Sequence, residues 1–113
     1  MKNILFGMLL LLVTFSAQGQ DKKNKNANYT TEVNGNCGLC KKRIEKAAFS
    51  VAGVKSAVWD MDTHQLSLIL NEEKTTLLDV KKVVANIGHD TDEVKASDET
   101  YANLNGCCQY ERK

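Results

Sequence analysis

Two helical patterns alternate with four strand patterns between residues 29 and 96, and this order restricts the folds that the chain can adopt. Apolar residues recur every three or four positions in the helix-like runs and alternate with polar ones in the strand-like runs. The strand-like runs are residues 29–33, 54–62, 65–70 and 92–96, and the helix-like runs contain Ile44, Ala47, Ala48 and Val51, then Leu77, Val80, Val84 and Ile87. The order β-α-β-β-α-β predicts an α+β, ferredoxin-like fold, in which a four-stranded antiparallel sheet carries two helices on one face.

Two cysteines lie between the first strand and the first helix. Cys37 and Cys40 are three positions apart, at or just before a helix N-terminus, where free backbone N–H groups and the helix dipole favour a thiolate. Two thiolates on one loop can converge on a single soft metal ion. The second helix, which starts at a Thr76 cap and stops at Gly88, would end at the same end of the sheet. We therefore expect His89 to lie near the two cysteines.

Other uses of this cysteine pair remain open. In an oxidising compartment Cys37 and Cys40 could form a disulfide that only staples the fold. A dithiol–disulfide oxidoreductase is a further alternative, because thioredoxin-like motifs also lie at a helix N-terminus. The chain has no proline, however, and cannot supply the cis-proline that faces the cysteines in such enzymes.

The first 28 residues have the composition of a targeting segment and a linker. Lys2 precedes an apolar run from Ile4 to Phe15, and small residues follow, which predicts a signal peptide over residues 1–19. The apolar run is shorter than a membrane-spanning helix, so we expect no stable membrane anchor after cleavage and a periplasmic or secreted protein. Residues 20–28 are polar and predict a linker. The chain has 15 basic and 14 acidic residues, a balance that does not suggest nucleic-acid binding.

A C-terminal tail, residues 97–113, follows the predicted domain and contains the vicinal pair Cys107 and Cys108. Vicinal cysteines rarely bond to each other, because relaxed disulfide geometry needs a larger Cα separation. Three uses remain: additional metal ligands, a disulfide to another chain, or pairing with the first two cysteines. The predicted fourth strand leads away from the cysteine loop by about 20 Å. A short helix capped by Ser97 or Asp98 would return the pair to the loop, and we predict this return.

The run Cys37-Gly38-Leu39-Cys40, after a strand and before a helix in this topology, resembles the heavy-metal-associated domain family. That family includes small copper chaperones, the periplasmic mercury-binding protein and modules of metal-pumping ATPases. The resemblance covers residues 29–96 and implies that Cys37 and Cys40 bind a soft metal ion in near-linear geometry. It also places His89 where the family has a residue that tunes the site. Residues 34–36 are Asn-Gly-Asn, so the buried methionine common in the family is absent.

The resulting hypothesis is an exported protein, not an enzyme, that carries or sequesters a soft metal ion. Copper(I) is the expected ion, with mercury(II) or zinc(II) as alternatives, and His89, Cys107 and Cys108 are candidate accessory ligands. The ion would pass by ligand exchange to a metal exporter or another metal-binding protein. Because we expect the hydrophobic core not to depend on the side chains of Cys37 and Cys40, their replacement by serine should leave the domain folded.

Overall fold

Three antiparallel strands form the sheet of this protein. The computed structural model describes residues 23–112, so the predicted signal peptide lies outside the described residues. The strands are β1 (Ala27–Glu32), β2 (Val54–Trp59) and β3 (Gln65–Leu70), and β3 lies between the other two. β1 begins two residues before the predicted strand, so the end of the predicted linker belongs to the sheet.

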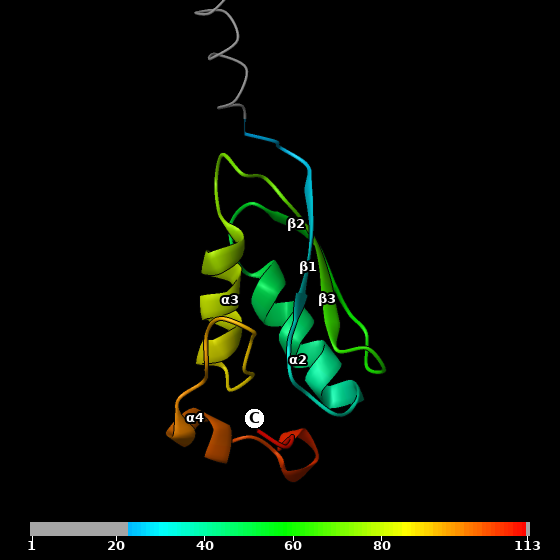
Figure 1. Ribbon diagram of the computed structural model, residues 1–113, viewed down its shortest axis with the longest axis vertical. Coiled ribbons are helices and arrows are strands. Elements are labelled where there is room, and N and C mark those ends of the chain that lie inside the picture. Colours follow the sequence, from blue (N-terminus) through cyan, green and yellow to red (C-terminus); the bar gives the residue numbers. More distant parts are fainter. Residues whose placement is uncertain (1–22, 113) are drawn as a thin grey trace, which may run out of the picture.

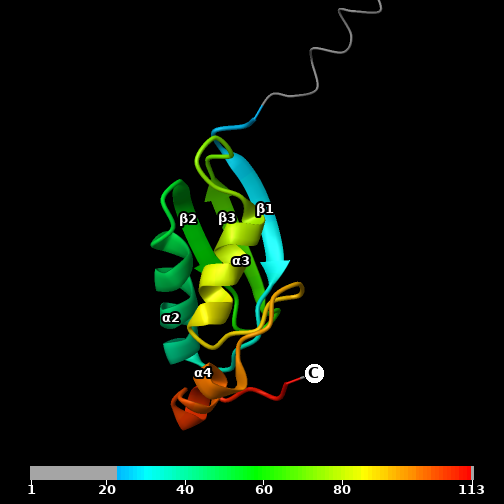
Figure 2. The ribbon, with the colours of Figure 1, turned by 90° about the vertical axis from the view of Figure 1, so that its left-hand side faces the viewer.

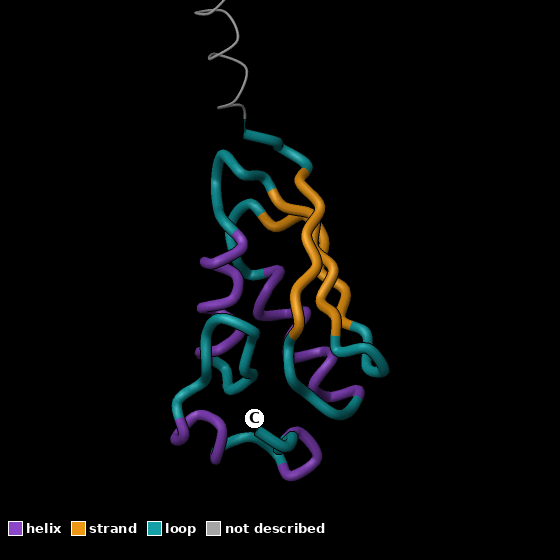
Figure 3. The backbone as a smooth tube through the Cα atoms, in the orientation of Figure 1, coloured by secondary structure: helices purple, strands orange, loops and turns teal. Residues whose placement is uncertain are grey.

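Two helices, α2 (Gly38–Phe49) and α3 (Leu77–Asn86), pack on one face of this sheet (Figures 1 and 2). The strands and helices form separate layers, which Figure 3 distinguishes by colour. The leucines of β3 alternate with polar or half-exposed residues and point to the helices, where they are buried, as their spacing predicted. The core between the layers includes Ile44, Trp59, Leu66, Leu68, Leu70, Val80 and Val84.

The ends of α3 follow the sequence signals closely. The hydroxyl of Thr76 accepts a hydrogen bond from the backbone N–H of Asp79, which satisfies one of the free donors of the first turn. At the other end Gly88 has φ +109°, a left-handed conformation that glycine adopts without steric cost. The side chain of Leu104 approaches this glycine so closely that an added Cβ would lie 2.9 Å from it. The chain therefore turns sharply after α3.

The predicted fourth strand, residues 92–96, is not formed within the described part of the chain. A single antiparallel bridge joins Val33 to Thr91, and there the strand pairing stops. Thr91 and Val94 close a tight turn, in which the Thr91 N–H donates to the Val94 carbonyl and the Val94 N–H donates to the Thr91 hydroxyl. The buried ammonium of Lys81 holds the acidic side chains of this turn, Asp92 at 2.9 Å and Glu93 at 2.6 Å. These polar contacts reverse the chain where the pattern predicted a strand.

The tail consequently stays at the end of the sheet where the cysteine loop lies. After the turn, the Ala96 N–H donates to the Asp90 carboxylate, and α4 (Asp98–Ala102) starts at a Ser97 cap. A short 3-10 helix, η2 (Gly106–Cys108), follows and packs beside the N-terminus of α2 (Figure 1). The predicted return of the tail is correct, but no long span has to be crossed. No helix between residues 23 and 112 is long and apolar enough to span a membrane.

Candidate metal centre

Four thiol groups meet at the N-terminus of α2. The Cys37 sulfur lies 3.5 Å from that of Cys40, 3.2 Å from that of Cys107 and 3.7 Å from that of Cys108. The sulfurs of Cys37, Cys40 and Cys108 all lie within 4.8 Å of one another. All four cysteines are free thiols. A donor set made only of thiols suits soft ions such as copper(I), mercury(II) and zinc(II).

The four sulfurs differ in their access to solvent. Cys37 is half-buried at the N-cap of α2, and Cys40 follows in the first turn with an exposed fraction of 0%. Cys108 is equally buried, whereas Cys107 is exposed. The expectation that the core does not depend on the loop cysteines is therefore wrong for Cys40, which packs within the hydrophobic core. One ligand of the loop is fixed in the core while the other borders solvent.

The N-terminus of α2 makes the Cys37 thiol acidic. No side-chain hydrogen bond of standard geometry caps this helix. The backbone N–H of Cys40 directs its positive end toward the Cys37 sulfur, and the hydrogen bond between the sulfurs of Cys37 and Cys107 acts in the same direction. Together these lower the pKa of Cys37 to about 6, although partial burial opposes the shift. At neutral pH Cys37 is therefore present as a thiolate.

The pKa values of the two tail cysteines are shifted in the opposite direction. Burial, followed by the hydrogen bonds with Cys40 and Cys37, raises the pKa of Cys108 far above its ordinary value. The pKa of Cys107 is also raised, first because of its hydrogen bond with the Cys37 sulfur. The metal-free site thus holds the Cys37 thiolate beside the protonated thiols of Cys107 and Cys108. An ion bound by several of these sulfurs must displace their protons.

His89 lies close to the cysteine loop, as expected, but outside the three-sulfur set. Its side chain is fully buried, and Nδ1–H donates to the Asn34 carbonyl at 2.8 Å, while the ring stacks on Tyr110. Nε2 is buried without a hydrogen-bond partner. Burial, reinforced by Arg43, lowers the pKa of His89, so the imidazole is neutral. In this structure His89 supports the loop that precedes Cys37.

The space next to Cys40 is filled by an aromatic ring. Gly35 stands at the position of the methionine that the resemblance leads one to expect, and a Cβ there would lie 3.1 Å from the Trp59 ring and 3.2 Å from the Cys40 Cβ. The Trp59 indole N–H donates to the Val33 carbonyl at 3.0 Å and is buried. A glycine in the loop thus allows tryptophan to pack against the buried cysteine.

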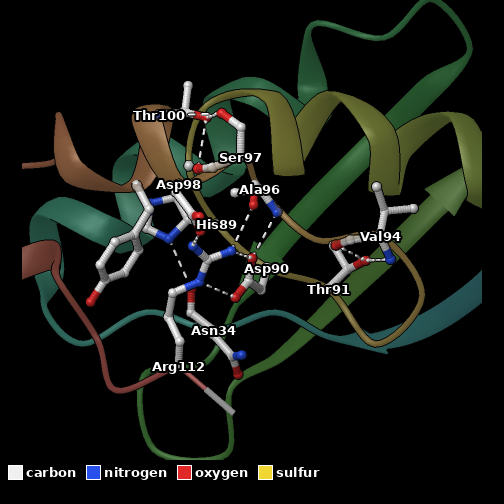
Figure 4. Close-up of polar contacts among 12 residues, drawn as sticks. Asn34, His89, Asp90, Thr91, Val94, Ala96, Ser97, Asp98, Thr100 and Arg112 are labelled. Carbon is white, nitrogen blue, oxygen red and sulfur yellow. Dashed lines mark hydrogen bonds and ion pairs between the residues drawn. The ribbon is translucent and has the colours of Figure 1, made fainter.

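The tail is attached through polar contacts that sequence reasoning did not identify. The hydroxyl of Tyr110 donates to the Gly88 carbonyl and accepts from the Asp90 N–H, both at 2.8 Å. Arg112 donates from two nitrogens to both oxygens of the Asp90 carboxylate, at 2.9 and 2.8 Å (Figure 4). Asp90 is 1% exposed, and Arg112 holds the pKa of its carboxyl low although burial opposes ionisation. No sequence spacing indicated this ion pair, because its partners are far apart in the chain.

Comparison with known proteins agrees with this geometry. The family model of the heavy-metal-associated domain matches residues 30–90. The structure of a CopZ metallochaperone is 27% identical, with a TM-score of 0.56, and covers 57% of this chain and 98% of its own. Two further structures support the fold: oxidised MerP from Ralstonia metallidurans CH34 and an N-terminal domain of a potential copper-translocating P-type ATPase from Bacillus subtilis in the Cu(I)-loaded state.

The MerP structure is 23% identical, with a TM-score of 0.51, and covers 58% of this chain and 96% of its own. The ATPase domain is 22% identical, with a TM-score of 0.56, and covers 58% of this chain and 84% of its own. The comparison with curated proteins found no match. The family match ends at residue 90, so the tail with Cys107 and Cys108 lies beyond it.

Proposed function

The chain belongs to the heavy-metal-associated domain family, and we propose that it carries or sequesters a soft metal ion, copper(I) in the first place, between Cys37 and Cys40. The observation that supports this most is the separation of 3.5 Å between the two sulfurs at a helix N-terminus. Copper(I) has been bound in a related domain, since one similar structure is described as Cu(I)-loaded. The proposal places the protein outside the cytoplasm, exported by the predicted signal peptide.

The burial of the two ligands supports transfer by ligand exchange. Cys40 is fixed in the core, whereas Cys37 is half-buried and borders the exposed Cys107. A thiolate of a metal exporter or of another metal-binding protein would enter on the Cys37 side. Cys37 would then release the ion before Cys40 does. Similar structures include domains of copper ATPases, which is the class of partner that we propose.

The ligand set favours copper(I) or mercury(II) over zinc(II). Structural zinc sites are closed by four ligands in tetrahedral geometry, all of them cysteine or cysteine together with histidine. Here the three ligand atoms that lie closest together are all sulfur, and two of them are buried. Soft ions that accept two or three thiolates fit this arrangement better. We therefore propose zinc(II) as the weakest of the three ions.

The test is a competition titration of the reduced protein, purified without oxygen, against copper(I), mercury(II) and zinc(II). Wild type is compared with a double variant, Cys37→Ser with Cys40→Ala, where alanine suits the apolar surroundings of Cys40. We expect tight copper(I) binding in wild type and a large loss in a double variant whose circular dichroism is unchanged. Equal copper(I) affinity in the two proteins would contradict the proposal.

A dithiol oxidoreductase is the second candidate, because the pKa of Cys37 is lowered to about 6, as in thiols that attack disulfides. A disulfide-exchange assay on a scrambled substrate separates the two functions. We expect little turnover. Robust turnover that requires both Cys37 and Cys40 would support the enzyme instead.

A further inference from the structure

We propose that Cys108 is a third ligand to the ion held by Cys37 and Cys40, so that the tail closes a trigonal, three-sulfur metal site. This inference rests on the proposed function and adds a residue outside the part of the chain that the family model matches. The sulfurs of these three cysteines form a set in which every pair lies within 4.8 Å. A trigonal site would make the protein hold its ion more firmly than a two-coordinate carrier does.

The spacing of the sulfurs fits three ligands better than two. With a metal–thiolate bond of about 2.3 Å, the zinc value, two sulfurs in linear geometry are about 4.6 Å apart and three in a trigonal plane about 4.0 Å. The Cys37 sulfur lies 3.5 Å from that of Cys40 and 3.7 Å from that of Cys108. Both distances are closer to the trigonal value. A linear site would require the larger displacement of the loop.

The tail holds Cys108 in place before any ion arrives. Cys108 has an exposed fraction of 0%, and its backbone N–H donates to the Asn105 carbonyl at 2.8 Å. Two residues further on, Tyr110 is hydrogen-bonded to the backbone of Gly88 and Asp90. A ligand that is already ordered adds affinity without the entropic cost of fixing a free tail.

The loop after α3 connects this tail to the cysteine loop. The Asn34 N–H donates to the Asp90 carbonyl at 2.9 Å, and the Asn34 carbonyl accepts from His89. Arg112 in turn binds the Asp90 carboxylate, and Figure 4 shows these side chains converging. The cysteine loop, the loop after α3 and the tail are distant in sequence and are thus joined beside the sulfurs. The position of Cys108 relative to Cys37 is therefore fixed by the fold.

Cys107 provides a matched control. It is adjacent in sequence and has the same chemistry, and its sulfur lies 3.2 Å from that of Cys37 and 4.0 Å from that of Cys108. It is exposed, however, and stands outside the set of three mutually close sulfurs. On binding, each thiol that becomes a ligand loses its proton to solvent, and Cys107 stays outside the ligand set. Replacing Cys107 should therefore leave the coordination unchanged.

The experiment is X-ray absorption spectroscopy of the reduced protein loaded with one equivalent of copper(I). We expect three sulfur ligands in wild type and in Cys107→Ser, and two in Cys108→Ala. We also expect copper(I) affinity to fall by about tenfold or more in Cys108→Ala only. Loss of a residue that merely supports a ligand already lowers metal affinity by about 10–100-fold, so loss of a ligand should cost at least as much. Sedimentation of each loaded protein as a monomer shows that the third sulfur comes from the same chain.

The wild-type spectrum tests the inference even if Cys108→Ala fails to fold. Two sulfurs in wild type would overturn the third ligand and leave the proposed function standing. A wild-type protein that does not retain copper(I) would overturn both. Loss of the third sulfur in Cys107→Ser, or a loaded dimer that shares its sulfurs, would also overturn the assignment to Cys108.

Discussion

Cys37 and Cys108 belong to one cluster but should react very differently. The N–H of Cys40 and the thiol of Cys107 lower the pKa of Cys37 to about 6, whereas burial raises that of Cys108. In the metal-free, reduced protein we expect alkylation of Cys37 by iodoacetamide to rise with a midpoint near pH 6. Cys108 should stay unmodified up to pH 8. Peptide mapping by mass spectrometry after timed alkylation measures both.

The variant Cys107→Ala tests the cause of this acidity. It removes the hydrogen bond with Cys107 that lowers the pKa of Cys37, so the alkylation midpoint of Cys37 should move to higher pH. A wild-type midpoint close to that of an ordinary cysteine, about 8.5, would show that the helix N-terminus does not act on this thiol.

Gly35, in the cysteine loop, leaves little space for a side chain. A Cβ there would lie 3.1 Å from the Trp59 ring and 3.2 Å from the Cys40 Cβ, both within the core. We expect Gly35→Ala to lower the free energy of unfolding by about 1–3 kcal/mol, the usual cost of overpacking. Gly38→Ala is the control, since nothing lies within 4 Å of its added Cβ. Urea unfolding of both metal-free variants measures the difference, and equal stabilities would show that the tryptophan can move aside.

Most helices and strands could be predicted from local patterns, and the one failure has a nonlocal cause. The Thr76 cap, the Gly88 stop and the alternating leucines of β3 act within a few residues, so the sequence displays them. The last predicted strand is replaced by a turn that depends on Lys81, which lies in α3 and binds both acidic residues of the Thr91–Val94 turn. The periodicity of apolar residues in the sequence cannot reveal this contact.

In the candidate site, too, the local features could be predicted and the nonlocal contacts could not. The spacing of Cys37 and Cys40 is local, and their convergence on a helix N-terminus followed from it. The arrival of Cys108 was predicted from chain reach, whereas the ion pair that secures the tail was not predicted. Asp90 and Arg112 form an ion pair across 22 positions, and only the folded backbone brings them together.

The attachment of the tail should depend on Arg112. Removing it leaves the carboxylate of Asp90, 1% exposed, with the Ala96 N–H as its remaining strong partner. We expect Arg112→Ala to destabilise the protein by about 2 kcal/mol, the range for hydrogen bonds to charged groups, and to increase amide exchange in residues 97–112. Arg112→Lys keeps the charge without the two-nitrogen contact and should give a smaller loss. Unchanged exchange in the tail of Arg112→Ala would show that Tyr110 and Leu104 suffice.

His89 makes the stability of the entire domain depend on pH. Burial, with a contribution from Arg43, lowers its pKa in the folded protein, while the Asn34 carbonyl and Asp90 oppose the shift only in part. As pH falls through about 6.5, the ordinary value, the unfolded chain binds a proton that the folded protein does not. Stability should therefore decrease from pH 7 to pH 5. The lowered pKa of Cys37 adds a dependence of the same sign, from about pH 8.5 down through 6.

The variant His89→Gln separates the two groups, because it retains an N–H donor for the Asn34 carbonyl and does not titrate. Urea unfolding at pH 5, 6 and 7 should show a smaller loss of stability in His89→Gln than in wild type. The difference between the two slopes of unfolding free energy against pH measures the contribution of His89. Parallel slopes would contradict the buried, neutral imidazole.

Metal binding should stabilise the fold as a unit, because the ion would connect α2, in the core, to η2, in the tail. A ligand that binds only the folded state at a free concentration 100 times its Kd adds about 2.7 kcal/mol. For a domain of this size each kcal/mol raises Tm by about 4–8 °C. The unfolded chain keeps its thiols and also binds copper(I), which reduces the gain.

We expect one equivalent of copper(I) to raise the Tm of the reduced protein, by less in Cys108→Ala than in wild type and Cys107→Ser. A chelator should reverse the rise, and equal shifts in all three proteins would show that the tail cysteine is not joined to the ion.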